Sequence, residues 1–283
     1  MRRRSATWMA VLCGLAAWVA VEQVDARQVE EAVHATAVLV REDPSAGLEL
    51  WRTALGPMWI PRPGVWVIRH LEWEQAVQKV YDHPSARVRP GDVVIDCGAH
   101  IGGFTRVALR AGARMVVVIE PEARNIRALR RNLEAELTSG RVKLVEKGVW
   151  DSSGKLPLHL SDVGDSHSLV ASVPGPGDAT IEVTTLDALV ASLHLDRVDF
   201  IKMDIEGAER RALRGAQQSL RRHGPRLAIS TYHQKGDPAA IASIIWEARP
   251  EYLVDSKDLV KTPHGTVPKV LFFRLLESPK TRP

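Results

Sequence analysis

The sequence predicts an α/β fold with a doubly wound, mostly parallel β-sheet and an N-terminal extension. From residue 92 onward, short continuous apolar segments alternate with segments of helical character, which is typical of a parallel sheet covered by helices on both faces. No helix is expected between the last two strands, so we predict an antiparallel edge there. The 283 residues are enough for one large domain with an extension or for two small domains.

The predicted elements follow one another in a regular order. Strands are expected at residues 92–96, 114–120, 142–149, 155–160, 181–185, 198–204, 226–231, 252–255 and 270–275. Helices are expected at residues 104–110, 121–137, 186–193, 208–222 and 238–248. Pro121 favours the first turn of its helix, and Thr185 is a predicted N-cap. Gly224-Pro225 is a predicted helix stop.

The N-terminus has the layout of a targeting segment. Arginines at positions 2–4 precede an uncharged apolar run at residues 6–21, a pattern typical of a signal sequence or a signal anchor. The run is short for a membrane span, which needs about 17–25 residues. We predict that residues 1–27 form a signal-like or membrane-anchor segment with membrane contact through 6–21. Cleavage near Ala26 and packing of a hydrophobic helix on the protein are the alternatives.

Residues 28–89 are predicted to be an accessory segment, followed by the main domain at 90–277 and a tail at 278–283. Residues 28–41 and 71–81 have helical character. Tryptophans stand at positions 51, 59, 66 and 73. We predict that they pack a small satellite core over the main domain, although such a cluster could also line an acceptor pocket or lie at a membrane interface.

The charge pattern favours solvated helix faces over a nucleic-acid site. The net charge is +4, and many arginines fall on the predicted helices at 122–137 and 210–222 without an accompanying nucleic-acid motif. We therefore expect no nucleic-acid partner. The two cysteines, Cys13 and Cys97, cannot form a disulfide framework, and Cys97 is expected to be a small core residue.

Three predicted strands end in an acidic residue: Asp96, Glu120 and Asp204. In a doubly wound sheet the ligand lies beyond the carboxyl ends of the strands, so these side chains can converge on one crevice. Glu120 follows Gly98 at close to the ~20-residue spacing at which an acid meets ribose hydroxyls. This spacing would also fit a nicotinamide cofactor. However, the loop reads Gly98-x-x-x-Gly102-Gly103 rather than G-x-G-x-x-G, which weakens that interpretation.

Several motifs resemble FkbM-type class I methyltransferases. They are Asp96-x-Gly98-Ala99-His100-Ile101-Gly102, Glu120-Pro121, Thr185-Leu186-Asp187-Ala188-Leu189 and Lys202-x-Asp204-x-Glu206-Gly207-x-Glu209. The resemblance covers residues 90 to 276 and is most specific in the last of these blocks. It implies a seven-stranded sheet with a reversed last strand, S-adenosyl-L-methionine as methyl donor, and an oxygen acceptor on a sugar, lipid or secondary metabolite.

The resemblance also implies a set of donor contacts. By position these are Asp96, Gly98, His100, Gly102 and Glu120, with Val149 and Trp150 where the fold flanks the adenine. Asp96 would help to hold the donor's amino group and Glu120 the ribose, whereas Trp150 either stacks on the adenine or packs in the core. This chain has His100 where the family commonly has asparagine.

An alcohol acceptor must lose a proton during methyl transfer, which calls for a base or a metal near the attacking oxygen. Asp204 is the first candidate for this catalytic base, and His233, just after a strand, is the second. Glu206 is a further candidate, although it could instead bond backbone N–H groups at the next helix start. Glu209 is expected to be structural. Asp204 and His233 could ligate a divalent metal, but with so few ligands we predict no metal site.

The sequence therefore predicts a methyltransferase that uses S-adenosyl-L-methionine to methylate a hydroxyl of a small-molecule, glycan or lipid acceptor. The polar loop at residues 161–180 either closes over the acceptor or has no role. The apolar run at residues 6–21 predicts membrane association, and because the donor is made in the cytosol we predict that the catalytic domain is cytoplasmic. A cytoplasmic or an exported protein is the alternative. A noncatalytic donor-binding or scaffold protein with a decayed site is the competing function, and an NAD(P)-dependent oxidoreductase is more distant.

Overall fold

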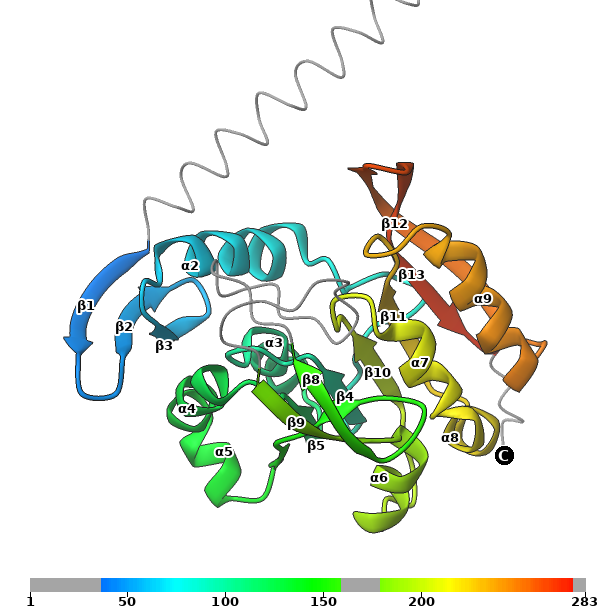
Figure 1. The fold of residues 1–283 in the computed structure, drawn as a ribbon, viewed down its shortest axis with the longest axis horizontal. Coiled ribbons are helices and arrows are strands. Elements are labelled where there is room, and N and C mark those ends of the chain that lie inside the picture. Colours follow the sequence, from blue (N-terminus) through cyan, green and yellow to red (C-terminus); the bar gives the residue numbers. More distant parts are fainter. Residues whose placement is uncertain (1–36, 159–178, 277–283) are drawn as a thin grey trace, which may run out of the picture.

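The computed structural model describes residues 37–158 and 179–276, and it confirms the predicted α/β fold (Figure 1). The main sheet has seven strands in the order β12-β13-β11-β10-β4-β5-β6. They are β4 (Val93–Cys97), β5 (Met115–Ile119), β6 (Val142–Val145), β10 (Phe200–Met203), β11 (Arg226–Ser230), β12 (Leu253–Thr262) and β13 (Gly265–Arg274). Strand β13 runs antiparallel to both of its neighbours, β11 and β12. The other pairs in this sheet are parallel. The strand order reverses between β4 and β10, which is where a doubly wound sheet binds its ligand.

Helices cover both faces of this sheet. They are α3 (Gly103–Arg110), α4 (Ala123–Asn132), α5 (Glu134–Thr138), α6 (Leu186–Ser192), α7 (Glu209–Arg214), α8 (Gln217–His223) and α9 (Asp237–Ala248). Side chains of a strand alternate between faces: in β4, Ile95 packs in a cluster with α6 to α9, and Val94 packs with α3 and α4. Figure 1 shows α3, α4 and α5 on one side of the central strands and α7, α8 and α9 on the other.

The accessory segment packs against the main domain. It contains a three-stranded sheet, β1 (Val38–Asp43), β2 (Leu48–Thr53) and β3 (Gly56–Pro61), followed by α2 (Val65–Glu72) and the π-helical turn η1 (Trp73–Gln78). Trp51 and Trp59 lie in a satellite core that also takes in Ile101 and Ala128 of the main domain. The Arg106 guanidinium on α3 donates to the carbonyls of Leu55 and Pro57, 3.1 and 2.7 Å away. The accessory segment therefore contacts α3 and the loop that precedes it.

The prediction of a helix at residues 28–41 is wrong for the part that the structure describes. Residues 38–43 form β1, which pairs antiparallel with β2. Val38, Leu39 and Val40 are β-branched or aliphatic residues that suit an extended edge, and tertiary pairing decides between the two conformations. The predicted helix at 71–81 is present as the end of α2 and η1.

Three predicted boundaries in the main domain are also corrected. Pro121 precedes the N-cap of α4, since Glu122 accepts a hydrogen bond from the Asn125 N–H, 2.7 Å away. The expected strand at 142–149 ends at Val145, and β7 (Gly148–Val149) joins β8 (Gly154–Leu158) and β9 (Ala179–Thr184) in a separate sheet. The predicted helix at 208–222 is divided into α7 and α8.

The division between α7 and α8 has a local cause. A Cβ on Gly215 would lie 2.3 Å from the carbonyl oxygen of Trp150, so the backbone must pass close to a neighbouring loop. The Asp187 carboxylate accepts hydrogen bonds from the Gln218 and Ser219 N–H groups at 2.9 and 2.7 Å. A continuous helix would already have used these donors within itself.

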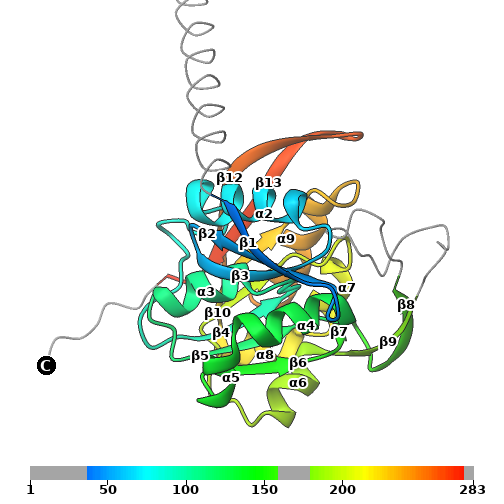
Figure 2. The same ribbon diagram turned by 90° about the vertical axis from the view of Figure 1, so that its left-hand side faces the viewer.

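Strands β12 and β13 are longer than predicted, and in both views their hairpin extends beyond the body of the molecule (Figures 1 and 2). Within the described residues, no helix is both long and apolar enough to cross a membrane. The predicted anchor at residues 6–21 and most of the loop at 161–180 lie outside the described residues.

Candidate active site

A cavity of about 360 Å³ lies beyond the carboxyl ends of β4, β5 and β10, at the switch in strand order. This volume falls in the range of small-molecule sites, about 300–1,000 Å³. One part of its wall comes from Gly98, His100 and Glu120, and another from Asp204 and Glu206. The crevice expected from the acidic strand ends is therefore present, and the structure brings residues from both parts of the sequence to it.

The glycine loop takes a backbone path that its residue types permit. Gly98 has φ +72°, and a Cβ there would stand 1.9 Å from the Asp204 carbonyl oxygen, so only glycine fits without movement. His100 has φ 53°, a conformation that is uncommon for residues other than glycine. Its backbone N–H donates to Glu120 Oε2 at 2.8 Å. This hydrogen bond joins the loop to the end of the next strand.

Glu120 is a buried carboxylate on the cavity wall, with 5% of its surface exposed. Its Oε1 accepts hydrogen bonds from the Glu122 N–H at 3.0 Å and from Asn125 Nδ2 at 3.3 Å. Burial raises the pKa of Glu120 to about 7, and the hydrogen bonds from the Glu122 and His100 N–H groups and from Asn125 oppose this rise only in part. Additional donors, such as the hydroxyls of a ribose, would stabilise the ionised form further.

Asp96 lies beneath the loop rather than on the cavity wall. It is fully buried; its Oδ2 accepts from the Thr105 hydroxyl at 2.7 Å, and its Oδ1 lies 3.3 Å from Lys202 Nζ. Lys202 also donates to the carbonyls of Cys97 and Gly98, 3.2 and 2.7 Å away. Burial opposes the charge on Lys202, but Asp96 and Asp204 raise its pKa above the ordinary value. Asp96 thus acts on the loop through Lys202, and Cys97 is buried as predicted.

Of the other predicted donor contacts, Val149 lines the cavity, whereas Gly102 and Trp150 do not. Val149 is buried and lines the cavity. Gly102 does not; with φ 91° it forms the N-cap of α3 and packs near Leu133. Trp150 is also outside the cavity wall, and its ring lies 5.6 Å from the Arg211 guanidinium. The structure therefore does not support stacking of Trp150 on a ligand, because β7 turns its side chain toward α7.

Asp204 follows β10 directly and reaches the cavity from there. Its Oδ2 accepts a hydrogen bond of 2.5 Å from the Tyr81 hydroxyl. Burial alone would raise the pKa of Asp204, but the positive charges of His233 and Lys202 and the hydrogen bond from Tyr81 lower it below the ordinary value. Asp204 is thus an ionised carboxylate at the cavity wall.

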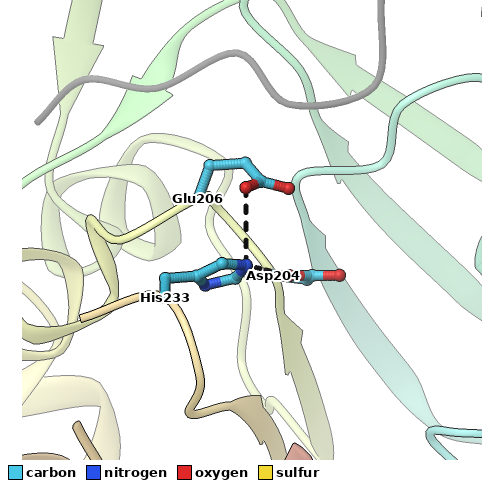
Figure 3. Close-up of side chains that lie close together, drawn as sticks. All are labelled: Asp204, Glu206 and His233. Atoms are coloured by element: carbon cyan, nitrogen blue, oxygen red, sulfur yellow. Dashed lines mark ion pairs between the residues drawn. The ribbon is translucent and has the colours of Figure 1, made fainter. Parts of the chain in front are cut away.

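His233 lies among three carboxylates. Its Nε2 is 3.5 Å from Asp204 Oδ1 and 3.4 Å from Glu206 Oε2 (Figure 3). Its Nδ1 is 3.0 Å from Glu209 Oε1. Burial would lower the pKa of His233, but the hydrogen bond and charge of Glu209, with the charges of Asp204 and Glu206, raise it to about 10. With only these neighbours, His233 carries a proton at neutral pH, which does not suit the predicted role of general base.

Of the two acids that follow Asp204, Glu209 has the structural role expected from the sequence. Its Oε1 accepts a hydrogen bond from the Ile205 N–H at 2.9 Å, just before α7. Glu206 lines the cavity and faces His233. Its φ of 54° and the φ of 97° at Gly207 form a tight left-handed turn that carries the Glu206 carboxylate to this position.

Two residues of the site were missed from the sequence. Tyr81 comes from the accessory segment, far from any motif, and no local signal pairs it with Asp204. Lys202 stands in the Lys-x-Asp-x-Glu-Gly-x-Glu block, so its membership in that motif could have assigned it to the loop. Both side chains line the cavity, and Lys202 Nζ lies 5.3 Å from the centre of the Tyr81 ring.

Comparison with known proteins identifies the family of the chain. A family model described as the methyltransferase FkbM domain matches residues 96–252, more than half of the 283 residues. Hexuronic acid methyltransferase AglP from Haloferax volcanii is 26% identical over 185 residues, which cover 65% of this chain and 73% of AglP. The 2-O-methyltransferase NoeI from Sinorhizobium fredii is 26% identical over 151 residues, which cover 47% of this chain and 60% of NoeI.

Among solved structures, the methyltransferase FkbM from Methylobacillus flagellatus KT has a TM-score of 0.49 at 23% identity, with 74% of this chain and 53% of that chain covered. The family match contains the glycine loop, Glu120, Asp204 and His233 within its bounds. The protein is a methyltransferase and belongs to the FkbM methyltransferase family.

Proposed function

We propose that this protein transfers a methyl group from S-adenosyl-L-methionine to a hydroxyl of a sugar. The observation that carries the proposal is the meeting of two chemically different walls in one cavity. Gly98, His100 and Glu120 form one wall, and Asp204 and Glu206 form the other. The names of AglP and NoeI, a hexuronic acid methyltransferase and a 2-O-methyltransferase, support a sugar hydroxyl as the acceptor.

The donor is proposed to bind along the first wall. Gly98 and His100 line the cavity beside Glu120, and the Glu120 carboxylate can accept two hydrogen bonds from a vicinal diol. The carboxylates of this cavity also attract a sulfonium cation. Asp96 contributes through Lys202, which holds the carbonyls of the loop in place, and Val149 offers an apolar surface for a flat ring.

The acceptor is proposed to bind at the second wall. During the reaction a hydroxyl oxygen attacks the methyl carbon, the carbon–sulfur bond breaks, and the hydroxyl proton leaves. Asp204 is the proposed proton acceptor. It is ionised, lines the cavity, and is held in place by the Tyr81 hydroxyl. Proton transfer to a carboxylate of low pKa is favourable only late, when the oxygen has already given electron density to the methyl group.

The test is methyl transfer to a defined acceptor. The full chain is incubated with methyl-labelled S-adenosyl-L-methionine and glycosides of hexuronic acids and neutral hexoses, each beside the matched 2-deoxy sugar. Label in a hydroxylated glycoside is the expected result, with loss of label where the 2-hydroxyl is absent if that oxygen is the acceptor. Donor binding by calorimetry without transfer to any sugar or to fractionated lysate would instead favour a donor-binding protein without catalysis.

The predicted membrane anchor is a separate part of the proposal. It depends on the apolar run at residues 6–21 alone. Protease treatment of intact cells tests its topology: the catalytic domain is expected to survive. Full digestion from outside would show that the domain is exported.

A further inference from the structure

We propose that Asp204, Glu206 and His233 form a binding site for a divalent transition-metal ion at the acceptor wall of the cavity. One ligand atom from each of the three residues can be chosen so that all lie within 4.8 Å of one another. The sequence alone offers only two or three good ligands and therefore predicts no metal site. The structure adds Glu206 to Asp204 and His233 and thus completes a set of three.

The spacing of the ligand atoms suits a single ion. His233 Nε2 lies 3.5 Å from Asp204 Oδ1 and 3.4 Å from Glu206 Oε2, and both contacts converge on the same ring nitrogen (Figure 3). Neighbouring ligands at about 2.1 Å from one ion stand about 3 to 3.5 Å apart. The three side chains therefore need little movement to coordinate an ion.

His233 is held as a metal-binding histidine usually is. Its side chain is 8% exposed, and within the described residues its Nε2 has no hydrogen-bond partner, nor has Asp204 Oδ1. The other nitrogen, Nδ1, meets the fully buried Glu209 carboxylate at 3.0 Å. A carboxylate at this nitrogen fixes the tautomer that carries its hydrogen on Nδ1 and turns the Nε2 lone pair toward the ion.

The backbone before α7 supports the same arrangement. Glu206 has φ 54°, a left-handed conformation that is uncommon for a non-glycine residue and that clusters at functional sites. Glu209 fixes this turn from below through the Ile205 N–H. One buried carboxylate thus positions both Glu206, through the turn, and His233, through its ring.

The donor set indicates which class of ion would bind. Magnesium and calcium prefer oxygen ligands alone, whereas an imidazole with two carboxylates suits manganese, zinc and similar first-row ions. Three carboxylates, those of Asp204, Glu206 and Glu209, surround a single histidine. A divalent cation would compensate this excess of negative charge, in competition with a proton on His233.

The role of the ion rests on the proposed function, but its binding does not. A metal ion at this wall would lower the pKa of an acceptor hydroxyl, so that the oxygen forms its bond to the methyl carbon while its proton passes to solvent. The carbon–sulfur bond breaks and the donor leaves as a neutral thioether. This would remove the difficulty that the Asp204 carboxylate is a weak base on its own.

Binding of Mn²⁺ to the full chain is measured by electron paramagnetic resonance after treatment with a chelator and in the absence of donor. We expect one bound ion in the unchanged protein and at least a tenfold loss of affinity in Glu206→Gln, on the scale of about 10–100-fold known for supporting residues of metal sites. Glu120→Gln is the matched control, since this carboxylate lines the same cavity outside the cluster. It should bind Mn²⁺ normally and lose affinity for the donor, whereas Glu206→Gln should keep the donor.

A second variant and a competitor sharpen the test. Glu209→Gln keeps the size of the side chain and should also weaken Mn²⁺ binding, with a changed resonance spectrum if His233 loses its orientation. Zn²⁺ should displace Mn²⁺ at far lower concentrations than Mg²⁺. Absence of Mn²⁺ binding by the unchanged protein, or equal binding by Glu206→Gln and Glu120→Gln, overturns the site. Methyl transfer at full rate in chelator would overturn the role of the ion in the reaction while leaving the proposed function intact. Bound Mn²⁺ without methyl transfer to any acceptor would support the site and overturn the proposed function.

Discussion

The two walls of the cavity are built in different ways. The donor wall is local: Gly98 and His100 belong to one loop, and the loop is joined to Glu120 by a hydrogen bond from its own backbone. The acceptor wall joins Tyr81 to Asp204, which are far apart in the chain, and the Asp204 carboxylate in turn contacts His233. Backbone geometry defines the first wall, and a network of charged side chains defines the second.

This difference has a consequence for how the walls respond to substitution. Changes at the donor wall act on backbone fit, so they should alter stability and donor affinity together. Changes at the acceptor wall remove charge from a network that is already anchored by Glu209 and Tyr81, so they should alter turnover and leave the donor in place.

The largest effect is expected at the acceptor wall, for Asp204→Asn. Loss of the carboxylate should reduce the turnover number about 10²–10⁴-fold, the usual contribution of a general base; loss of a metal ligand would act in the same direction. Donor affinity should stay within about tenfold, or ~1.4 kcal/mol. Steady-state kinetics and calorimetry with S-adenosyl-L-methionine measure the two quantities separately. Unchanged turnover would remove Asp204 from the reaction.

At the donor wall, Gly98→Ala should reduce the free energy of unfolding by about 3 kcal/mol or more. The new Cβ would lie 1.9 Å from the Asp204 carbonyl oxygen, so the loop or the end of β10 must move. Gly91→Ala is the matched control, because Gly91 also has a positive φ, +85°, but no atom within 4 Å of its Cβ position. It should cost only about 1–2 kcal/mol. Urea denaturation measures the free energy of unfolding of both variants. Equal losses of stability would show that the loop can move away from the Asp204 carbonyl at little cost.

The same contrast explains what could be predicted from the sequence. The strands of the main sheet and the glycine loop follow from apolar segments and glycine spacing, which are local signals. Tyr81 could not be placed, because only the fold brings the accessory segment next to Asp204. The position of the Glu206 carboxylate at the cavity depends on the left-handed turn at Glu206, which cannot be predicted from the residue type.

The differences between the predicted and the observed secondary structure also arise from contacts between distant parts of the chain. Residues 38–43 form a strand because β2 pairs with them, although their sequence also permits a helix. The break between α7 and α8 depends on the approach of Trp150 to Gly215 and on the cap supplied by Asp187. Asp96 and Trp150 occupy the expected positions in the chain, but their side chains do not line the cavity. Asp96 contacts Lys202 and Trp150 contacts Arg211.

A moderate effect is expected from pH through Glu120, whose pKa burial raises to about 7. The ionised carboxylate accepts hydrogen bonds from the ribose, so donor affinity should fall by up to about tenfold between pH 8 and pH 6. Without the donor, the free energy of unfolding should instead decrease as the pH rises. Because the folded pKa lies above the ordinary value of 4.5, ionisation of Glu120 costs free energy, and its contribution to stability declines as the pH rises from 4.5 to 7.

Calorimetry across this pH range tests the assignment, with Glu120→Gln as the control. The amide does not titrate, so the variant should bind the donor more weakly at pH 8 and show a flatter pH profile. A profile as steep as that of the unchanged protein would assign the pH dependence to a group other than Glu120.

The smallest effect is expected for His100→Asn, which introduces the residue that the family resemblance leads us to expect at this position. Asparagine tolerates the left-handed conformation better than most residues, and position 100 has φ 53°. The contact that matters most at the donor wall, from the position-100 N–H to Glu120, belongs to the backbone and survives the change. Donor affinity should therefore shift less than about fivefold, or ~1 kcal/mol, with unfolding unchanged or slightly more difficult. His100→Val is the contrasting variant, since a β-branched side chain resists positive φ and should weaken both. A large loss of donor affinity in His100→Asn alone would show that the imidazole itself binds the donor, and that the donor wall, like the acceptor wall, depends on a side chain.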